Sequence, residues 1–357
     1  MRYFLELCLK SVQAAIANLD AEIIVVDNDS EDDSCEMVKA LFPEVLLIEN
    51  KTNFGFSKGN NIGVSKARGE FICILNPDTV VPEDAFEKLL EFSANKEKLG
   101  IIGCKLINGV GDFLPESKRN IPVVKAAFKK LIGNSKYYYA THLNENETGK
   151  VAVLVGAFMF MKRQLYLEVG GFDETYFMYG EDIDLSYSVL KAGYHNFYVG
   201  DISVIHYKGE STLRDEKYVQ RFYGAMQIFY KKHFKKNLLF DVLVWLGIRF
   251  ASVFKKIPVH KLKTVNQYIF VSDKMNVQLQ TKLTKKLVLT SELKNIKPYT
   301  EVICDANVLT FKEIISIFES NTATKQVTYK ILPKQSNFIL GSDNATSQGE
   351  IIVLNEF

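Results

Sequence analysis

The sequence of 357 residues lacks three features that would indicate particular classes of protein. It contains no uncharged apolar run of 18 residues, which argues against a transmembrane helix. Its five cysteines are scattered and form no Cys-x-x-Cys pair, which argues against a disulfide framework or a zinc site and fits a reducing, cytoplasmic setting. The first eleven residues have a short apolar run and no small-residue cleavage site, so they make a poor signal peptide.

The remaining bulk properties are those of an ordinary globular protein. Apolar residues make up 47% of the chain and charged residues 24%. The length predicts two or three domains with substantial cores. A net charge of +2 gives no indication of nucleic-acid binding, and we expect no nucleic-acid partner.

The first hundred residues alternate between helical and strand patterns. Apolar spacing predicts a helix over residues 2–19, and short apolar runs predict strands over 21–26, 45–49 and 71–75 with helices between them. Strand–helix–strand alternation favours parallel pairing with right-handed crossovers. The prediction is therefore an α/β fold with a mixed, mostly parallel sheet. The segment 108–150 has weak periodicity and reads as an irregular insertion, plausibly a mobile loop on the acceptor side.

Acidic residues follow the predicted strands or open a predicted helix at three places. Asp27 ends the first strand, Asp78 follows Asn76-Pro77 after the strand 71–75, and Glu181-Asp182 begin a helix. Ligands of open α/β sheets bind beyond the carboxyl ends of the strands. There Asp27 would accept hydrogen bonds from a base, Asp78 would hold a hard cation on a pyrophosphate, and Asp182 would act as a general base. The alternative is that these residues are turn or helix-capping residues.

The composition changes after residue 206. Residues 207–263 contain 13 Lys and Arg but 4 Asp and Glu. Within them, the apolar run 238–254 predicts either a helix packed on the preceding domain or an interfacial helix in peripheral contact with an anionic membrane surface. Residues 264–357 read as a small α/β domain with strands near 267–271, 287–290, 301–304, 327–332 and 351–354 and a helix at 310–319.

Five motifs in this order resemble the inverting family 2 glycosyltransferases of the GT-A fold, and most closely a rhamnosyltransferase-like subgroup. The motifs are DNDS at 27–30, NFGFSKGNNIG at 53–63, LNPDT at 75–79, GGFDE at 170–174 and YGEDIDL at 179–185. The resemblance covers residues 1–235. It divides the chain into a catalytic domain (1–235), a basic amphipathic helical segment (236–263) and a C-terminal α/β domain of unknown role (264–357).

The resemblance implies a role for each matching residue. Asp182 would be the catalytic base, and Asp78 with His206 would hold Mg²⁺ or Mn²⁺ on the diphosphate. The family's first metal-binding acid is replaced by Asn76, which leaves a weaker set of protein ligands. A buried structural histidine is the alternative for His206. Residues of the substrate pocket would be Asp27 at the nucleobase, Asn53, Gly55, Phe56, Asn60, Asn76, Gly156 facing the donor sugar, and Glu181.

The implied activity is sugar transfer, with inversion, from a nucleotide-diphosphate sugar to a glycan or lipid-linked acceptor during cell-surface polysaccharide synthesis. The favoured donor is dTDP-rhamnose, and the favoured location is the cytoplasm or the inner face of the cytoplasmic membrane. Two alternatives are a catalytically inactive sugar-nucleotide-binding or scaffold protein and a nucleotidyltransferase; the latter is disfavoured because no Gly-rich basic phosphate loop lies near residue 1.

The resemblance also exposes one departure. Family members begin with an apolar strand before the first helix, whereas this sequence begins inside the helix. We therefore expect a sheet without its usual first strand, in which 21–26 and 71–75 lack a shared neighbour and expose backbone groups. The apolar residues 351–355 are a weak candidate to replace that strand.

Overall fold

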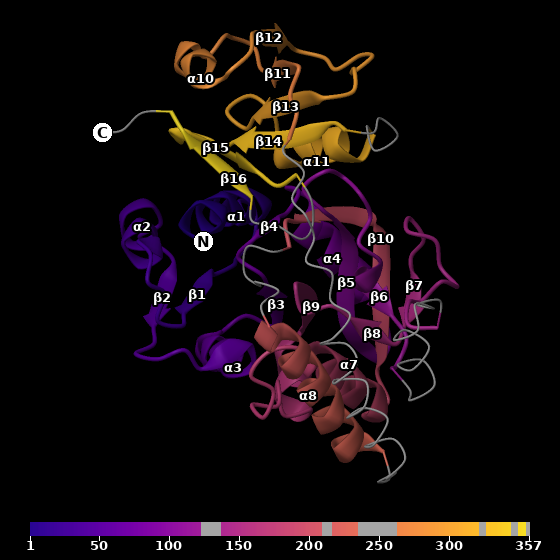
Figure 1. Cartoon of the computed structure of the whole chain (residues 1–357). Coiled ribbons are helices and arrows are strands. Elements are labelled where there is room, and N and C mark those ends of the chain that lie inside the picture. Colours follow the sequence, from indigo (N-terminus) through magenta and orange to yellow (C-terminus); the bar gives the residue numbers. More distant parts are fainter. Residues whose placement is uncertain (123–136, 209–215, 235–262, 321–325, 344–348, 355–357) are drawn as a thin grey trace.

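The computed structural model describes residues 1–122, 137–208, 216–234, 263–320, 326–343 and 349–354. The basic segment 236–263 lies almost wholly outside these ranges, so its predicted helix and membrane contact stay predictions. Figure 1 shows two stacked parts: an N-terminal α/β part, and above it a C-terminal sheet that packs on the first helix.

A small parallel sheet opens the N-terminal part. Strand β1 (Ile24–Asp27) pairs in parallel with β2 (Leu46–Glu49), as the alternating pattern predicted. Three helices surround this pair: α1 (Arg2–Ala15), α2 (Ser34–Leu41) and α3 (Gly55–Lys66). The connections are short and each helix has an apolar face, so the helices bury these faces against the strands.

The central sheet has the order β3-β9-β5-β10-β4, with β7 also paired to β10. Its strands are β3 (Phe71–Leu75), β4 (Thr79–Val80), β5 (Leu99–Ile107), β7 (Gly149–Val151), β9 (Phe158–Lys162) and β10 (His195–His206). Only the pair β5–β10 is parallel, while β3–β9, β5–β9, β10–β4 and β10–β7 are antiparallel.

The mixed α/β class is confirmed, but the prediction of a mostly parallel sheet was wrong for this part. The strand–helix alternation that favours parallel neighbours stops after β5. The apolar run at 151–161 then forms β8 (Val153–Leu154) and most of β9, and β9 inserts antiparallel between β3 and β5. No periodicity in the sequence marks such an insertion, because it depends on which distant edges remain available.

Strands β1 and β3 share no neighbour among the described strands, as the sequence predicted. They belong to different sheets, and β3 pairs with β9. We call this separation the break between β1 and β3. Residues 351–355 do not fill the break, because β16 (Glu350–Val353) pairs antiparallel with β15 (Phe338–Gly341) in the C-terminal sheet. Apolar side chains of β1 and β3 therefore stay partly accessible.

Helix α7 (Glu181–Lys191) carries the predicted base and packs against β8 and β10. It follows Gly180, whose φ of +81° favours glycine, and its first turn holds three acids where the helix dipole stabilises negative charge. The remaining elements of this part are α4 (Ala85–Ala94), a 3₁₀ turn at Pro115–Ser117, β6 (Lys118–Arg119), α6 (Arg163–Glu168) and α8 (Glu216–His233).

The C-terminal part is a six-stranded sheet of order β12-β11-β13-β14-β15-β16. The predicted strands correspond to β11 (Gln267–Val271), β12 (Leu287–Thr290), β13 (Thr300–Asp305), β14 (Thr328–Leu332) and β16, and the predicted helix to α11 (Phe311–Ser320). Strand β15 and the short helix α10 (Val277–Lys282) were not predicted.

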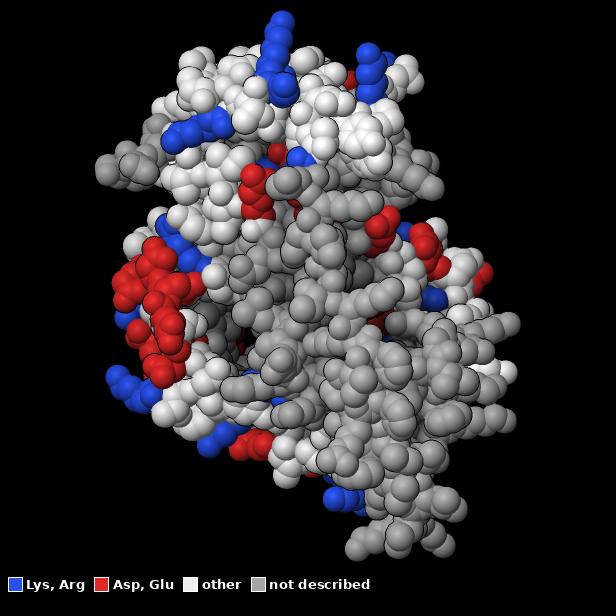
Figure 2. Space-filling view, viewed as in Figure 1, with Lys and Arg blue, Asp and Glu red and all other residues white. Residues whose placement is uncertain are grey.

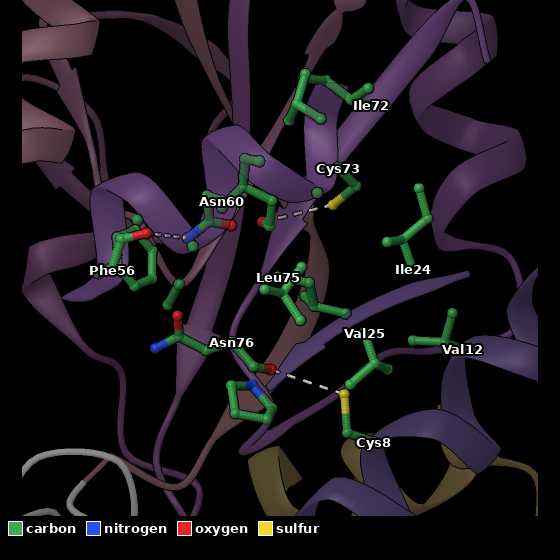
Figure 3. Close-up of a pocket in the computed structure, with 18 of the residues that line it drawn as sticks. Cys8, Val12, Ile24, Val25, Phe56, Asn60, Ile72, Cys73, Leu75 and Asn76 are labelled. Carbon is green, nitrogen blue, oxygen red and sulfur yellow. Dashed lines mark hydrogen bonds between the residues drawn. The ribbon is translucent and has the colours of Figure 1, made fainter. Parts of the chain in front are cut away.

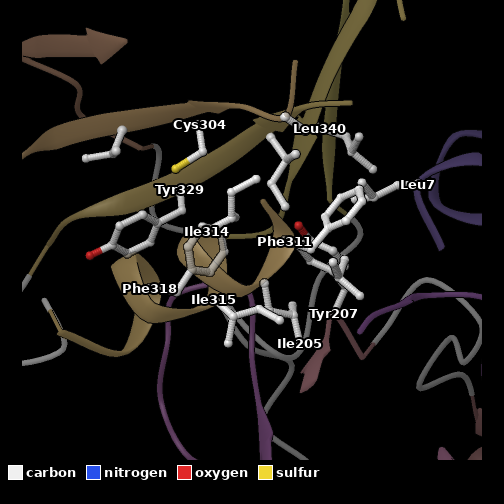
Figure 4. Packing of buried hydrophobic residues seen from close by; sticks show 14 of the residues in the cluster. Leu7, Ile205, Tyr207, Cys304, Phe311, Ile314, Ile315, Phe318, Tyr329 and Leu340 are labelled. Carbon is white, nitrogen blue, oxygen red and sulfur yellow. The ribbon is translucent and has the colours of Figure 1, made fainter. Parts of the chain in front are cut away.

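One apolar cluster joins the two parts. Helix α11 places Phe311, Ile314, Ile315 and Phe318 between the C-terminal sheet and the N-terminal part (Figure 4). The N-terminal part contributes Phe4, Leu7, Val80, Ile107, Ile205 and Tyr207, all buried. Because β10 ends at His206, the C-terminal part supports the strand end that carries a predicted site residue.

Two surface properties bear on the predicted partners. Within the described ranges, no helix is long and apolar enough to cross a membrane. Acidic side chains gather on the α2 flank of the molecule (Figure 2), where Asp29, Glu31, Asp32, Asp33 and Glu36 are exposed. An anionic surface would repel this flank.

Candidate active site

One cavity of about 1580 Å³ collects nearly every predicted site residue. Its lining includes all ten of the following: Asp27, Asn53, Gly55, Phe56, Asn60, Asn76, Gly156, Glu181, Asp182 and His206. These residues come from strand ends, a loop and two helix starts that are far apart in the sequence. The structure thus brings together what the sequence showed only as separate motifs.

One half of the cavity is apolar. Figure 3 shows Ile24 and Val25 of β1 on one side, with Cys73 and Leu75 of β3 on the other. Helix α1 adds Cys8, whose thiol contacts the backbone oxygen of Asn76 at 3.7 Å. This half coincides with the break between β1 and β3, so its volume includes the place of the expected strand.

The loop 53–56 is held by backbone contacts on both sides. Gly55 has φ of +80°, and a Cβ atom there would lie 2.4 Å from the carbonyl oxygen of Phe177, so only glycine fits. Asn28 donates to the Gly55 carbonyl at 2.9 Å, and the Phe56 amide donates to the Phe177 carbonyl at 2.9 Å. Asn60 donates to the Phe56 carbonyl at 2.9 Å (Figure 3). The loop therefore presents a preformed wall to a ligand.

Asp27 has a turn role as well as a place in the cavity. Its Oδ2 accepts hydrogen bonds from the amides of Asp29 and Ser30, both at 3.1 Å. These two hydrogen bonds support the alternative that Asp27 is a turn residue. The two amides orient the carboxylate at the end of β1 without removing it from the cavity wall.

Asp78 lies behind the cavity wall, not in its lining. Its side chain is fully buried, and its Oδ1 lies 3.4 Å from His206 Nε2, which itself is 3.3 Å from Asn76 Nδ2. A separation of 3.4 Å is longer than a good hydrogen bond and short enough for both atoms to reach one small cation. Asn76 Oδ1 lies at the same place, buried and with no hydrogen-bond partner among the described residues.

Asp182 is held by donors on both carboxylate oxygens. Arg119 Nη2 lies 2.5 Å from Oδ2, the Gly156 amide donates to the same oxygen at 3.1 Å, and the Ile183 amide donates to Oδ1 at 2.8 Å. A Cβ atom on Gly156 would lie in ordinary van der Waals contact with Phe56 at 3.4 Å and with the Cβ of Asp182 at 3.5 Å. The three hydrogen bonds fix the direction of the Asp182 carboxylate.

The neighbouring Glu181 is in the opposite situation. It is 6% exposed, and its Oε2 has no hydrogen-bond partner in the described part of the chain. Burial, together with the charge of Asp182, raises the pKa of Glu181 to about 8. A buried carboxyl group with a raised pKa beside a second carboxyl group is typical of acid–base sites.

The sequence reasoning missed the basic and aromatic residues on the far wall of the cavity. These are Arg119, Tyr138, Tyr139 and Lys208, together with Glu116. Lys208 pairs with Glu116 and, against the effect of burial, lowers the pKa of that carboxyl. No motif marks these residues, because four of them lie in the segment 108–150 with its weak periodicity and Lys208 lies beyond the last of the five motifs.

Comparison with known proteins bears on the identity of this part. Residues 3–170 match the family described as Glycosyl transferase family 2. The match covers a little under half of the chain. The matched segment includes β1–β3, β5 and the cavity residues from Asp27 to Gly156.

Rhamnosyltransferases are among the relatives of this chain, at low sequence identity. An N-acetylglucosaminyl-diphospho-decaprenol L-rhamnosyltransferase of Mycobacterium tuberculosis is 26% identical over 211 residues, which is 54% of this chain and 68% of that protein. Rhamnosyltransferase WbbL of Escherichia coli is 28% identical over 162 residues, 43% of this chain and 61% of that protein. The predicted rhamnosyltransferase-like resemblance is thus confirmed as a distant one.

Among solved structures, a mannosyltransferase of Pyrobaculum calidifontis in complex with GDP-Man and Mn²⁺ matches with a TM-score of 0.46 at 17% identity. That match covers 71% of this chain and 68% of the other.

Proposed function

We propose that this protein transfers a sugar from a nucleotide-diphosphate sugar to a glycan or lipid-linked acceptor, with inversion, in cell-surface polysaccharide synthesis. The observation that carries the proposal is the shared cavity: the Asp182 carboxylate, the wall formed by Asn53–Phe56 and the Asn76–His206 pair line one space. The family match and the names of the relatives supply the reaction class. Among donors, dTDP-rhamnose is our first choice, because two relatives are rhamnosyltransferases.

In this reaction Asp182 takes the proton of the acceptor hydroxyl while that oxygen attacks the anomeric carbon. A bond forms between the acceptor oxygen and the carbon, and the bond from the carbon to the diphosphate oxygen breaks with its electron pair going to the diphosphate. A single displacement from the opposite face inverts the configuration. One carboxylate at the anomeric carbon is therefore enough, and Asp182 is the cavity residue that we assign to it.

A divalent cation, Mg²⁺ or Mn²⁺, fits the residues at the end of β3. Asp78 and His206 would hold it, with Asn76 beside them, and the donor diphosphate would complete the coordination. Two protein ligands suit Mg²⁺, which is commonly held by few side chains plus substrate phosphates. In the ranges that the structure covers, no cluster of three or more His, Cys, Asp or Glu residues is found, so a metal would depend on the donor. When bound, such an ion stabilises the charge of the leaving diphosphate.

The alternative is a catalytically inactive sugar-nucleotide-binding or scaffold protein. This alternative predicts that donor binds without turnover.

The test is a nucleoside-diphosphate release assay on the full chain with Mg²⁺ or Mn²⁺, a panel of nucleotide sugars including dTDP-rhamnose, and lipid-linked or glycan acceptors. We expect release with one donor, loss of release with a chelator, and loss by a factor of roughly 10² or more in Asp182→Asn with donor binding retained. Asp201→Asn, an exposed aspartate outside the cavity, is the matched control and should be fully active. Donor binding without release under every condition would favour the inactive alternative, and turnover by Asp182→Asn would exclude Asp182 as the base.

A further inference from the structure

The contact between Arg119 and Asp182 joins three elements at the wall of the cavity. Arg119 lies on β6, which pairs with β8 through Arg119 and Val153. Its Nη2 donates to the Leu154 carbonyl of β8 at 2.9 Å and to Asp182 of α7 at 2.5 Å. Arg119 is 6% exposed and Asp182 7%, so little water competes with these bonds. A buried guanidinium that reaches a carboxylate across 63 positions of sequence is not a surface ion pair.

The guanidinium contacts only one of the two adjacent carboxyl groups in the described part of the chain. It lies against Asp182, whereas Glu181 Oε2 has no hydrogen-bond partner within the described residues. The side chain of Asp182 is therefore fixed in direction by a buried partner that Glu181 lacks. Burial opposes the charge of Arg119, but Asp182 and Tyr138 outweigh it and raise the pKa of the guanidinium, which therefore stays charged.

We propose that Arg119 is a positioning residue for sugar transfer: it holds the Asp182 carboxylate against β8 and fixes the direction in which that carboxylate accepts a proton. The proposal rests on the proposed function, since it needs Asp182 as the base. Arg119 and the Gly156 amide both occupy Oδ2, so Oδ1, which receives a single backbone donor, is the oxygen that receives the proton.

Other ionisable groups around the pair are accounted for in the same geometry. They are Tyr138 beside Arg119, Tyr176 packed near Glu181, and Glu116, His206 and Lys208 on the cavity wall. Lys208 is paired with Glu116, and His206 lies against Asp78, so neither side chain is paired with Asp182 in the described contacts. Arg119 is thus the cation that contacts Asp182 in the part of the chain that the structure describes.

The test compares Arg119→Met and Arg119→Lys with the parent chain over a range of pH, with kcat, KM for the donor and donor affinity measured separately. For Arg119→Met we expect kcat to fall about 10²-fold with donor affinity unchanged, because a displaced base costs rate and not binding. The acid limb of the kcat profile should move upward by about one pH unit or more, since a cation beside a carboxylate has shifts of that size. Arg119→Lys should restore the pH profile but only part of kcat, because an ammonium supplies the charge without the planar fork.

A double substitution separates positioning from a merely structural role. If Arg119 acts through Asp182, the residual rate of Asp182→Asn and that of Asp182→Asn with Arg119→Met should be equal. Arg163→Gln, which removes an arginine that is not itself part of the cavity lining, is the control and should leave the pH profile in place. An unchanged profile and kcat in Arg119→Met, or additive losses in the double variant, would overturn the proposal while leaving Asp182 as the base. Should Arg119→Met fail to fold, Arg119→Lys and its pH profile decide the matter alone.

Discussion

At the scale of single residues, environment separates groups that the sequence shows as equals. Glu181 and Asp182 are adjacent acids in the first turn of α7, yet Asp182 receives three donors and Glu181 Oε2 receives none within the described residues. Gly55 contributes by its missing side chain, since a Cβ atom there would lie 2.4 Å from the Phe177 carbonyl oxygen. The chemistry of the site depends on these contacts more than on residue type.

Glu181 makes a prediction about stability and pH. Its pKa rises from 4.5 to about 8 on folding, so the folded state binds this proton more tightly than the unfolded state. Its contribution to the free energy of unfolding is complete below about pH 4.5 and is lost as the pH rises through 8. At about 1.4 kcal/mol per pKa unit, the loss is on the order of a few kcal/mol. The free energy of unfolding of Glu181→Gln, relative to that of the parent chain, should therefore increase as the pH rises from 5 to 8.5.

Urea midpoints at pH 5, 7 and 8.5 measure this difference. Exposed Glu97→Gln is the matched control and should follow the parent chain at each pH. A constant difference between Glu181→Gln and the parent chain across this range would mean that Glu181 is ionised throughout.

At the scale of elements, helix α11 depends on an acid from the other part of the molecule. Glu83 accepts from the Phe311 amide at 2.7 Å and from the Lys312 amide at 2.9 Å. Thr310 and Glu313 complete the same helix start as a reciprocal capping box, with the Thr310 amide donating to Glu313 at 2.8 Å. A carboxylate at a helix N-terminus satisfies free amides and opposes the positive end of the helix dipole.

Removal of this cap should destabilise the interface between the two parts. We expect Glu83→Ala to lower the free energy of unfolding by about 1–2 kcal/mol, because two helix amides lose their acceptor. Thermal melts with calorimetry measure the loss. Exposed Glu91→Ala on α4 is the control and should have a far smaller effect. Equal melting of the two variants would show that water replaces the Glu83 carboxylate without cost.

At the scale of the whole molecule, the two parts share one apolar cluster. Helix α11 covers Val80, Ile107 and Ile205, which lie on strands of the central sheet, and strand β10 carries His206 one residue beyond Ile205. Polar contacts at the margin include Ser203 with Glu319 at 2.7 Å. The C-terminal part thus buries the back of the strand that ends in the cavity, although its own biochemical role is not identified by these contacts.

A chain that ends at residue 263 should expose this cluster. We expect it to bind an apolar dye such as ANS and to unfold at a lower temperature than the full chain, because large apolar side chains such as Phe4 and Tyr207 lose their cover. Dye fluorescence and thermal melts of both forms measure the effect. A shortened chain with unchanged melting and no dye binding would mean that the two parts fold independently.

Sequence alone determined the features that depend on near neighbours. The helix α7 with its acidic first turn, the end of β3 before Pro77, and five of the C-terminal strands follow from spacing, turn chemistry and apolar runs. The order of the motifs also identified the family, and it placed ten residues that share one cavity. Such signals extend over only a few residues, so they can be recognised in the sequence itself.

Tertiary structure decided the features that depend on distant partners. The antiparallel insertion of β9, the position of Asp78 behind His206 and the contact of Arg119 with Asp182 each join segments many tens of residues apart. No local pattern records such pairings, because the free energy of a buried ion pair or a strand pair depends on what the whole fold brings together. The sequence therefore determined which acids the site contains, and the fold determined which partners each of them has.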